Sequence, residues 1–322
     1  MSTSAPARTS RGTRRADTAR PVKSDRTKAQ ARLGWLLAGP AFLIMVAVIF
    51  YPVVQAVWDS LFSYRLTAPS EREFIGLGNY GTILTDQVFW SALGVTALVT
   101  VVTVAVELVL GFVLALIMHK AIKSTRGLVR TAILVPYGII TVVSAYAWYY
   151  MFSIDSGYIN NWFSWLPGID SDLNWFAQGP TALMVIMLSE IWKTTPFISL
   201  LLLAGLAQVP DDLSEAASVD GATWWQRLTR VILPNMKAAI MVATLFRALD
   251  AFRIFDSVFI MTNGAYGTEV LSLLAYRTSI GRLEIGLGSA VSVILFLCVG
   301  LIAFAAVKIF KVDLARGQGG AK

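Results

Sequence analysis

The chain has 322 residues, of which 56% are hydrophobic and only 15% are charged, whereas a soluble globular domain carries about 25% charged residues. This composition excludes a soluble domain and predicts a membrane protein. The net charge of +7 does not indicate a nucleic-acid partner, because nine of the 27 basic residues precede residue 33 and fit the charge asymmetry of membrane topology. One cysteine, Cys298, and one histidine, His119, exclude an internal disulfide and give no ligand cluster for a metal ion.

The N-terminal segment, residues 1–32, is rich in Ser, Thr, Ala and Arg and nearly lacks large apolar residues. It predicts a disordered basic cytoplasmic arm, because it cannot bury enough surface to fold alone. The apolar run that follows is longer than the core of a signal peptide, so we interpret it as a membrane span.

Six hydrophobic stretches are each long enough to cross a hydrocarbon core of about 30 Å, which takes roughly 20 helical residues. They are residues 33–58, 91–118, 128–152, 181–206, 237–261 and 286–310. Together they predict a transmembrane domain over residues 33–310, followed by a cytoplasmic tail over residues 311–322.

Basic residues close to membrane spans are retained on the cytoplasmic side, and they alternate along this chain. They gather in the arm, in the connection between the second and third stretches, and in the tail. The connection at 153–180 instead has Asp155, Asp170 and Asp172 and no basic residue. We therefore expect a protein of the cytoplasmic membrane with both termini, and the segment 211–234, on the cytoplasmic side.

Two outer connections carry further patterns. Phe74-Ile75-Gly76-Leu77-Gly78-Asn79-Tyr80 predicts a turn in which the two glycines serve backbone geometry. The acidic outer connection contains a cluster of aromatic residues, which fits an aromatic belt at the membrane interface as well as it fits substrate contact: Tyr158, Trp162, Trp165 and Trp175.

Ionisable residues within membrane spans are functional candidates by default, because a charge at mid-membrane is costly. The predicted spans hold seven of them: Glu107, Glu190, Lys193, Arg247, Asp250, Arg253 and Asp256. At a rise of about 1.5 Å per residue, Glu190 and Lys193 of the fourth span lie at a similar depth in the membrane to Arg247 and Asp250 of the fifth. Spacing of three predicts the pairs Glu190–Lys193, Arg247–Asp250 and Arg253–Asp256.

Two interpretations of these charges remain open. One is a water-filled cavity that binds polyols through planar charged groups, with Phe252 beside them. The other is a structural network of ion pairs. Glu107, alone and deeper in its span, is expected to be structural. Pro196 predicts a kink or break in the fourth span.

The segment 211–234 is a soluble-looking island between apolar runs. Asp211 and Asp212 are candidate N-caps of a first short helix of about nine residues, which Gly221 ends in a left-handed conformation. Thr223 is expected to cap a second helix, and Pro234 to stop it.

Three blocks in this island, Glu215-Ala216-Ala217, Asp220-Gly221-Ala222 and Ile232-Leu233-Pro234, resemble the "EAA" loop of permease subunits of ATP-binding-cassette (ABC) importers. Phe74–Tyr80 resembles an element of the sugar permeases in that superfamily. The resemblance runs from about Gly34 to Phe310. It is to the maltose-transporter permease family, and within it to the permeases of actinobacterial trehalose importers.

This resemblance implies an all-α membrane protein with six transmembrane helices, the type I ABC importer permease fold and cytoplasmic coupling helices. It implies half of a pathway for a di- or oligosaccharide, with trehalose as the first candidate. The implied partners are a second permease subunit, an ATPase dimer, an external substrate-binding (lipo)protein and membrane lipid. The residues implied to couple to the ATPase are Glu215, Ala216, Ala217, Asp220, Gly221, Ala222, Leu233 and Pro234.

The chain has no Gly-x-x-x-x-Gly-Lys-Ser/Thr phosphate loop, so we expect no enzyme activity and no cofactor here, with ATP and Mg bound by the partner ATPase. The maltose relatives hold sugar with asparagines where this chain has Asp250 to Phe255 without one. The alternatives are a non-sugar ABC permease, a self-contained secondary transporter, or a membrane enzyme. The 215–234 block has no second copy in the sequence, which argues against a transporter built from repeated halves.

Overall fold

The computed structural model describes residues 25–120 and 125–310, which divide into two compact units between Val54 and Gln55. Helix α1 (Asp25–Asp59), whose residues up to Val54 belong to the first unit, begins at Asp25 and continues through Pro40 and Pro52. Residues 25–32 are therefore helical, where a disordered arm was predicted. Their Lys, Ala, Gln and Arg residues are good helix formers, so the apolar helix extends into them. The rest of the arm and the tail 311–322 lie outside the described residues.

Four helices are long and apolar enough to cross a membrane in the part of the chain that the structure describes. They contain residues Arg32–Asp59, Gln87–Lys120, Gly179–Leu206 and Ile285–Lys308. The last three correspond to α3 (Gln87–Lys120), α7 (Gly179–Leu206) and α14 (Ile285–Phe310). Four of the six predicted stretches thus form single long helices.

The other two stretches are helical but broken, so the prediction of one continuous helix in each was wrong. The first divides into α4 (Arg126–Leu134), the 3₁₀ turn η2 (Pro136–Gly138) and α5 (Thr141–Phe152). Pro136 cannot donate a helical hydrogen bond, and Ile139 and Ile140 are extended, with ψ of 135° and 136°. The second divides into α11 (Lys237–Ala251) and α12 (Asp256–Met261), separated by Phe252–Phe255.

The predicted break at Pro196 is absent, because α7 is one helix from Gly179 to Leu206. A proline inside a helix removes the donor to the carbonyl four residues earlier, here that of Trp192, yet α7 continues past it. Two hydroxyl groups beside Pro196 bond to other carbonyls of the helix. Thr195 Oγ1 donates to the Ile191 carbonyl at 2.5 Å, and Ser199 Oγ donates to the Pro196 carbonyl at 2.6 Å.

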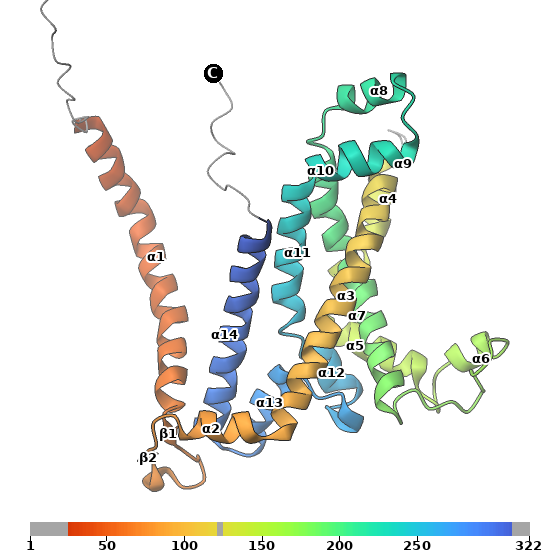
Figure 1. The fold of residues 1–322 in the computed structure, drawn as a ribbon. Helices are drawn as coiled ribbons and strands as arrows, with labels where there is room; N and C mark the ends of the chain where they lie inside the picture. The colour runs from red at the N-terminus through yellow and green to blue at the C-terminus, as the bar shows by residue number, and fades with distance from the viewer. Residues whose placement is uncertain (1–24, 121–124, 311–322) are drawn as a thin grey trace, which may run out of the picture. The chain divides into compact units, whose positions relative to one another are not determined.

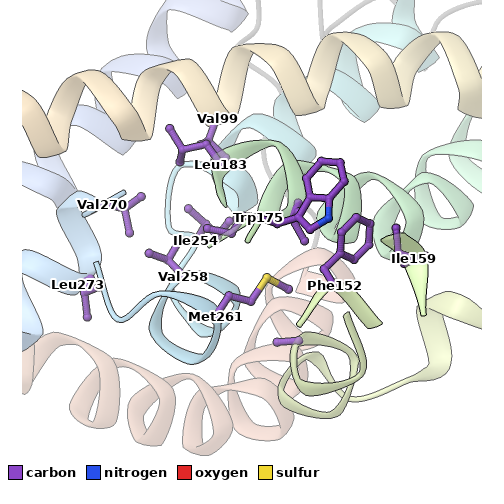
Figure 2. Packing of buried hydrophobic residues seen from close by; sticks show 13 residues of the cluster. Val99, Phe152, Ile159, Trp175, Leu183, Ile254, Val258, Met261, Val270 and Leu273 are labelled. Atoms are coloured by element: carbon purple, nitrogen blue, oxygen red, sulfur yellow. The ribbon is translucent and has the colours of Figure 1, made fainter. Parts of the chain in front are cut away.

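The core of the second unit lies between α3, α7 and α11 and continues into α5, α12 and α13 (Leu271–Tyr276) (Figure 1). Figure 2 shows one cluster, in which Phe152 and Trp175 pack near Ile254 and Val258. Two glycines permit close helix contacts. A Cβ on Gly111 of α3 would lie 2.8 Å from Ile198 of α7, and one on Gly205 of α7 would lie 2.2 Å from Ala239 of α11.

The motif at 74–80 forms part of a small hairpin next to the end of α1. Strand β1 (Phe62–Ser63) pairs antiparallel with β2 (Glu73–Phe74), and the loop between them holds η1 (Pro69–Glu71). Gly76 has a φ of +57°, a left-handed conformation that agrees with the turn predicted for this glycine-rich motif. Asn79, in α2 (Gly78–Thr85), donates to the Ser60 and Phe62 carbonyls at 2.8 and 2.9 Å. Asn79 thus satisfies carbonyls where α1 has ended.

The aromatic cluster of the acidic connection divides between core and surface. Trp162 and Trp165 are exposed, the first in α6 (Ile159–Phe163) and the second just after it. Trp175 is buried, and its Nε1 donates to Asn160 Oδ1 at 2.6 Å. An interfacial belt therefore does not explain Trp175, which belongs to the core.

The remaining elements connect these helices. Between α7 and α11 lie α8 (Asp211–Val219), α9 (Trp224–Arg227), the π-helix η3 (Leu228–Ile232) and α10 (Leu233–Asn235). Between α12 and α14 lie the turn η4 (Ala265–Gly267), α13 and the π-helix η5 (Arg277–Gly281). Figure 1 shows α8 and α9 at one end of the second unit and α13 near the other.

Candidate functional site

A buried ion cluster centres on Arg247 of α11, which is 2% exposed. Its Nε donates to Oε2 of Glu107 at 2.5 Å, and its Nη2 donates to Oε1 of the same carboxylate at 3.0 Å. This two-point geometry is the strongest that an arginine and a carboxylate adopt. Glu107 was expected to have a structural role, and its partner was not predicted. The partner lies 140 positions away in the sequence, where no spacing rule could find it.

Two more carboxylates contact the same guanidinium. Glu190 of α7 lies 3.4 Å from Nη2, and Asp250 of α11 accepts from Nη1 at 2.7 Å. The Glu107 and Glu190 side chains are at most 8% exposed, whereas the Asp250 side chain is 66% exposed. The cluster therefore has a buried part, with two carboxylates on one guanidinium, and one carboxylate at the surface.

Only one of the three predicted pairs forms. Arg247–Asp250 is confirmed, but no ion pair joins Glu190 to Lys193 or Arg253 to Asp256 among the described residues. Glu190 turns instead toward Arg247 and toward Ser257 of α12, whose hydroxyl donates to it. The Lys193 ammonium lies 5.8 Å from the centre of the Tyr137 ring, and Arg253 Nε donates to the Leu249 carbonyl at 3.1 Å.

A pocket of about 250 Å³ lies beside the cluster. Both helix breaks contribute to its wall, together with one face of α7. Its lining residues are Tyr137, Thr141, Glu190, Lys193, Thr194, Arg247, Asp250, Arg253, Ile254, Phe255 and Asp256. The candidate pathway residues were six of the charged residues and Phe252, and all six charged residues line this pocket: Glu190, Lys193, Arg247, Asp250, Arg253 and Asp256.

Phe252 is the seventh and does not line the pocket. It is 6% exposed and packs in a hydrophobic cluster with Phe89 and Leu271. The sequence reasoning also missed Tyr137 and Thr141. The signal for them was Pro136-Tyr137-Gly138, a helix-breaking tripeptide inside a predicted span.

The segment 211–234 forms two short helices, as predicted, with Gly221 between them. The first, α8, has nine residues. Gly221 has φ of +79°, the left-handed conformation that glycine adopts without strain. The N-cap of α8 is Pro210 and no side chain caps it, so Asp211 and Asp212 are not caps. They lie in the first turn, where negative charge still favours the helix dipole.

The second helix is capped as predicted but ends differently. Thr223 Oγ1 accepts from the Gln226 backbone at 3.3 Å, and Gln226 Oε1 accepts from the Thr223 backbone at 2.8 Å. Pro234 does not stop this helix. The wider π turn η3 precedes it, and Pro234 lies in α10, where the first helical positions need no donor.

The residues of the EAA-like blocks differ in exposure. Glu215, Ala216, Asp220, Gly221 and Pro234 are exposed, and Ala217, Ala222 and Leu233 are half-buried. In Figure 1, α8 stands clear of the long helices at the end of the unit. The first two blocks thus form an accessible surface on a short, well-defined turn between helices.

A family model for the "binding-protein-dependent transport system inner membrane component" matches residues 107–315. The chain belongs to this family. It is therefore a membrane permease subunit of an ABC importer, and ATP hydrolysis belongs to a separate subunit. A self-contained secondary transporter and a membrane enzyme are no longer alternatives.

Curated relatives agree with this assignment, and a solved structure shares the fold. The chain is 50% identical over 290 residues to the trehalose transport system permease protein SugA of Mycobacterium tuberculosis, covering 90% of this chain and 92% of that one. It is 37% identical to the trehalose/maltose transport system permease protein MalF of Thermococcus litoralis, covering 84% and 90%. A chain in a bacterial alginate ABC transporter structure matches with a TM-score of 0.76 at 22% identity, covering 89% and 97%. That last likeness supports the fold alone.

We predict that Arg247→Ala strongly reduces the amount of folded protein. Removing the guanidinium leaves Glu107 and Glu190 buried without their cation, and breaking a buried pair in this way costs about 3–5 kcal/mol. The measurement is the yield and thermal stability of detergent-extracted protein in a monodisperse gel-filtration peak. Arg253→Ala, at an exposed position, is the matched control and should retain the parent yield. Equal stability of Arg247→Ala and the parent would contradict this role.

Proposed function

We propose that this chain forms half of the translocation pathway of an ATP-driven, binding-protein-dependent importer of a di- or oligosaccharide, with trehalose as the first candidate substrate. The observation that carries the proposal is the 50% identity to a trehalose permease across 90% of the chain. The second relative, at 37% identity, is also named for trehalose and maltose.

The pocket beside Arg247 is the proposed pathway segment. Its wall offers acceptors on Glu190, Asp250 and Asp256 and donors on Lys193 and Arg253, and sugars are recognised by such hydrogen-bonding groups together with aromatic faces. The ring of Tyr137, stacked on Phe197 with centroids 5.4 Å apart, supplies an aromatic group. At about 250 Å³ the pocket is smaller than the roughly 300–1,000 Å³ of most ligand sites. A second permease subunit would complete it.

The proposed partners follow from this role. They are the second permease subunit, an ABC ATPase dimer that binds ATP and Mg, and an external substrate-binding lipoprotein that delivers the sugar. Membrane lipid surrounds the apolar helices, and no nucleic acid is involved. The chain itself needs no cofactor.

The proposed topology has six crossings of the cytoplasmic membrane and both termini inside. The two broken segments, α4–α5 and α11–α12, then serve as the third and fifth crossings. Non-helical backbone at membrane depth is tolerated where it is buried in protein or lines a water-filled cavity, and both breaks contribute to the pocket. The acidic connection at 153–178 faces outward in this arrangement.

This topology predicts that a cysteine at position 170 reacts from outside the cell. The test uses Asp170→Cys in a chain that also carries Cys298→Ser, because Cys298 is the only native cysteine. A membrane-impermeant maleimide should label intact cells, and Ser218→Cys, on α8, should react only after the membrane is opened. The reverse pattern would overturn the orientation.

The substrate proposal predicts saturable trehalose uptake by the reconstituted complex. Vesicles containing both permeases and the ATPase should accumulate labelled trehalose when ATP is inside and the loaded binding protein outside. Unlabelled trehalose should compete more strongly than maltose or sucrose. Uptake of none of these sugars, with a non-sugar ligand on the binding protein, would favour the alternative of a non-sugar ABC permease.

We further propose that the turn between α8 and α9 docks on the ATPase. Its contact residues would be Glu215, Ala216, Ala217, Asp220, Gly221 and Ala222, with Leu233 and Pro234 anchoring the segment to the membrane helices. The support is the exposure of Glu215, Ala216 and Asp220. Small alanine side chains allow another backbone to approach, and Glu215 can form a charge-assisted contact with a basic group.

We predict that Glu215→Lys and Gly221→Val each abolish sugar-stimulated ATP hydrolysis and uptake while the chain still inserts. The first reverses the charge of the contact, and the second places a β-branched residue at φ of +79°, where such residues are strongly disfavoured. ATPase assays in vesicles and copurification of the ATPase are the measurements. Ser218→Ala, exposed on the same helix, is the control. Parent-like coupling in both variants would show that the ATPase docks elsewhere.

A further inference from the structure

The pocket presents one carboxylate that is exposed and yet fixed in place. Asp250 has a side chain exposed to 66%, but its Oδ2 accepts from Arg247 Nη1 at 2.7 Å. No hydrogen bond to Oδ1 occurs among the described residues. One oxygen of Asp250 is therefore held by the protein, and the other remains available at the pocket wall.

The direction of Arg247 Nη1 is set by the opposite edge of the same guanidinium. Glu107 binds Nε and Nη2 together, at 2.5 and 3.0 Å, and two bonds to one edge of a planar fork fix the plane. The Thr194 hydroxyl lies 2.7 Å from Glu107 Oε1 and 2.6 Å from the Glu190 backbone carbonyl, so these two acceptors share its hydrogen. The orientation thus passes from Thr194 and Glu107 to Arg247, and from Arg247 to Asp250.

Charge neutralisation alone does not account for Glu107. Arg247 carries one positive charge and contacts three carboxylates, Glu107, Glu190 and Asp250. Without the charge of Glu107, two carboxylates still face the guanidinium. What Glu107 supplies, and the single contacts of the other two do not, is the two-point fixation of the guanidinium plane.

Glu190 extends the same cluster across the break between α11 and α12. One of its oxygens lies near Arg247 of α11, and the other accepts from Ser257 of α12. The residues between these helices include Arg253, Ile254 and Phe255, which line the pocket. The cluster therefore holds both the exposed acceptor and the wall around it.

We propose that Glu107 is a positioning residue, which acts through Arg247 to aim the Asp250 carboxylate at a hydroxyl group of the transported sugar. This inference rests on the proposed function, in which the pocket is part of the sugar pathway. A preorganised acceptor avoids the loss of side-chain freedom when the sugar arrives, so fixing it strengthens the interaction during passage.

The experiment is a double-mutant cycle on trehalose uptake by the reconstituted complex, with Glu107→Gln, Asp250→Asn and both together. Each single variant should lower the maximal uptake rate per assembled complex about tenfold, the lower range for a hydrogen bond to a charged group. The half-saturating concentration of loaded binding protein should stay within about twofold of the parent value, because docking is untouched. If Glu107 acts through Asp250, the double variant should be no slower than Asp250→Asn.

Three results would overturn the proposal: parent-like uptake by Glu107→Gln, multiplied losses in the double variant, or an equal loss in a control. The control is Glu269→Gln, which removes a carboxylate from the ion pair with Arg277, 2.9 Å long and outside the pocket. If Glu107→Gln does not assemble, Thr194→Val removes the hydroxyl that contacts Glu107 Oε1 and also bonds to the Glu190 backbone carbonyl of the same helix. It should reduce uptake in the same direction, and unchanged uptake there would also overturn the proposal.

If the proposed function itself is wrong, the parent complex does not transport trehalose. Transport by the parent together with parent-like Glu107→Gln would remove the positioning role alone.

Discussion

The second unit of this protein depends on one guanidinium held among carboxylates from three helices. Arg247 of α11 is joined to Glu107 of α3 and Glu190 of α7, and all three side chains are buried. Charges are expensive to bury, and such a cluster persists only when its geometry and hydrogen bonds are nearly complete. Thr194 and Ser257 add hydroxyl donors to the two glutamates. The helices must therefore meet at one particular depth and rotation.

The two broken helices have their breaks beside the pocket that adjoins this cluster. In a continuous helix the backbone N–H and C=O groups bond to one another, so only side chains face a neighbouring pocket. At Val135–Ile140 and at Phe252–Phe255 the chain leaves the helical path beside the same pocket. Broken helices near the middle of the membrane are typical of transport sites. The structure thus combines a buried charged centre with a pocket whose wall is shared between regular helices and the two breaks.

The sequence predicted features that depend on local chemistry. The length of apolar runs identified α1, α3, α7 and α14, and Gly221 and Thr223 were read correctly because turns and caps follow from single residues. It did not predict the break after Ala251, where no proline or glycine interrupts the run. The pair of Glu107 with Arg247 joins residues 140 positions apart. Spacing rules identify neighbouring residues on one helix and give no information on contacts between helices. For this reason Glu190 was predicted to pair with Lys193.

The close approach of α7 and α11 at Gly205 and Ala239 has a mechanical consequence. There is no space for even a methyl group on Gly205, so the two helices are clamped just where the segment 211–234 leaves one and joins the other. At this point the two backbones meet without a compressible side chain between them, so a displacement of α11 toward α7 is passed directly to α7. Arg247 lies further along α11, on the side of this contact away from the segment 211–234.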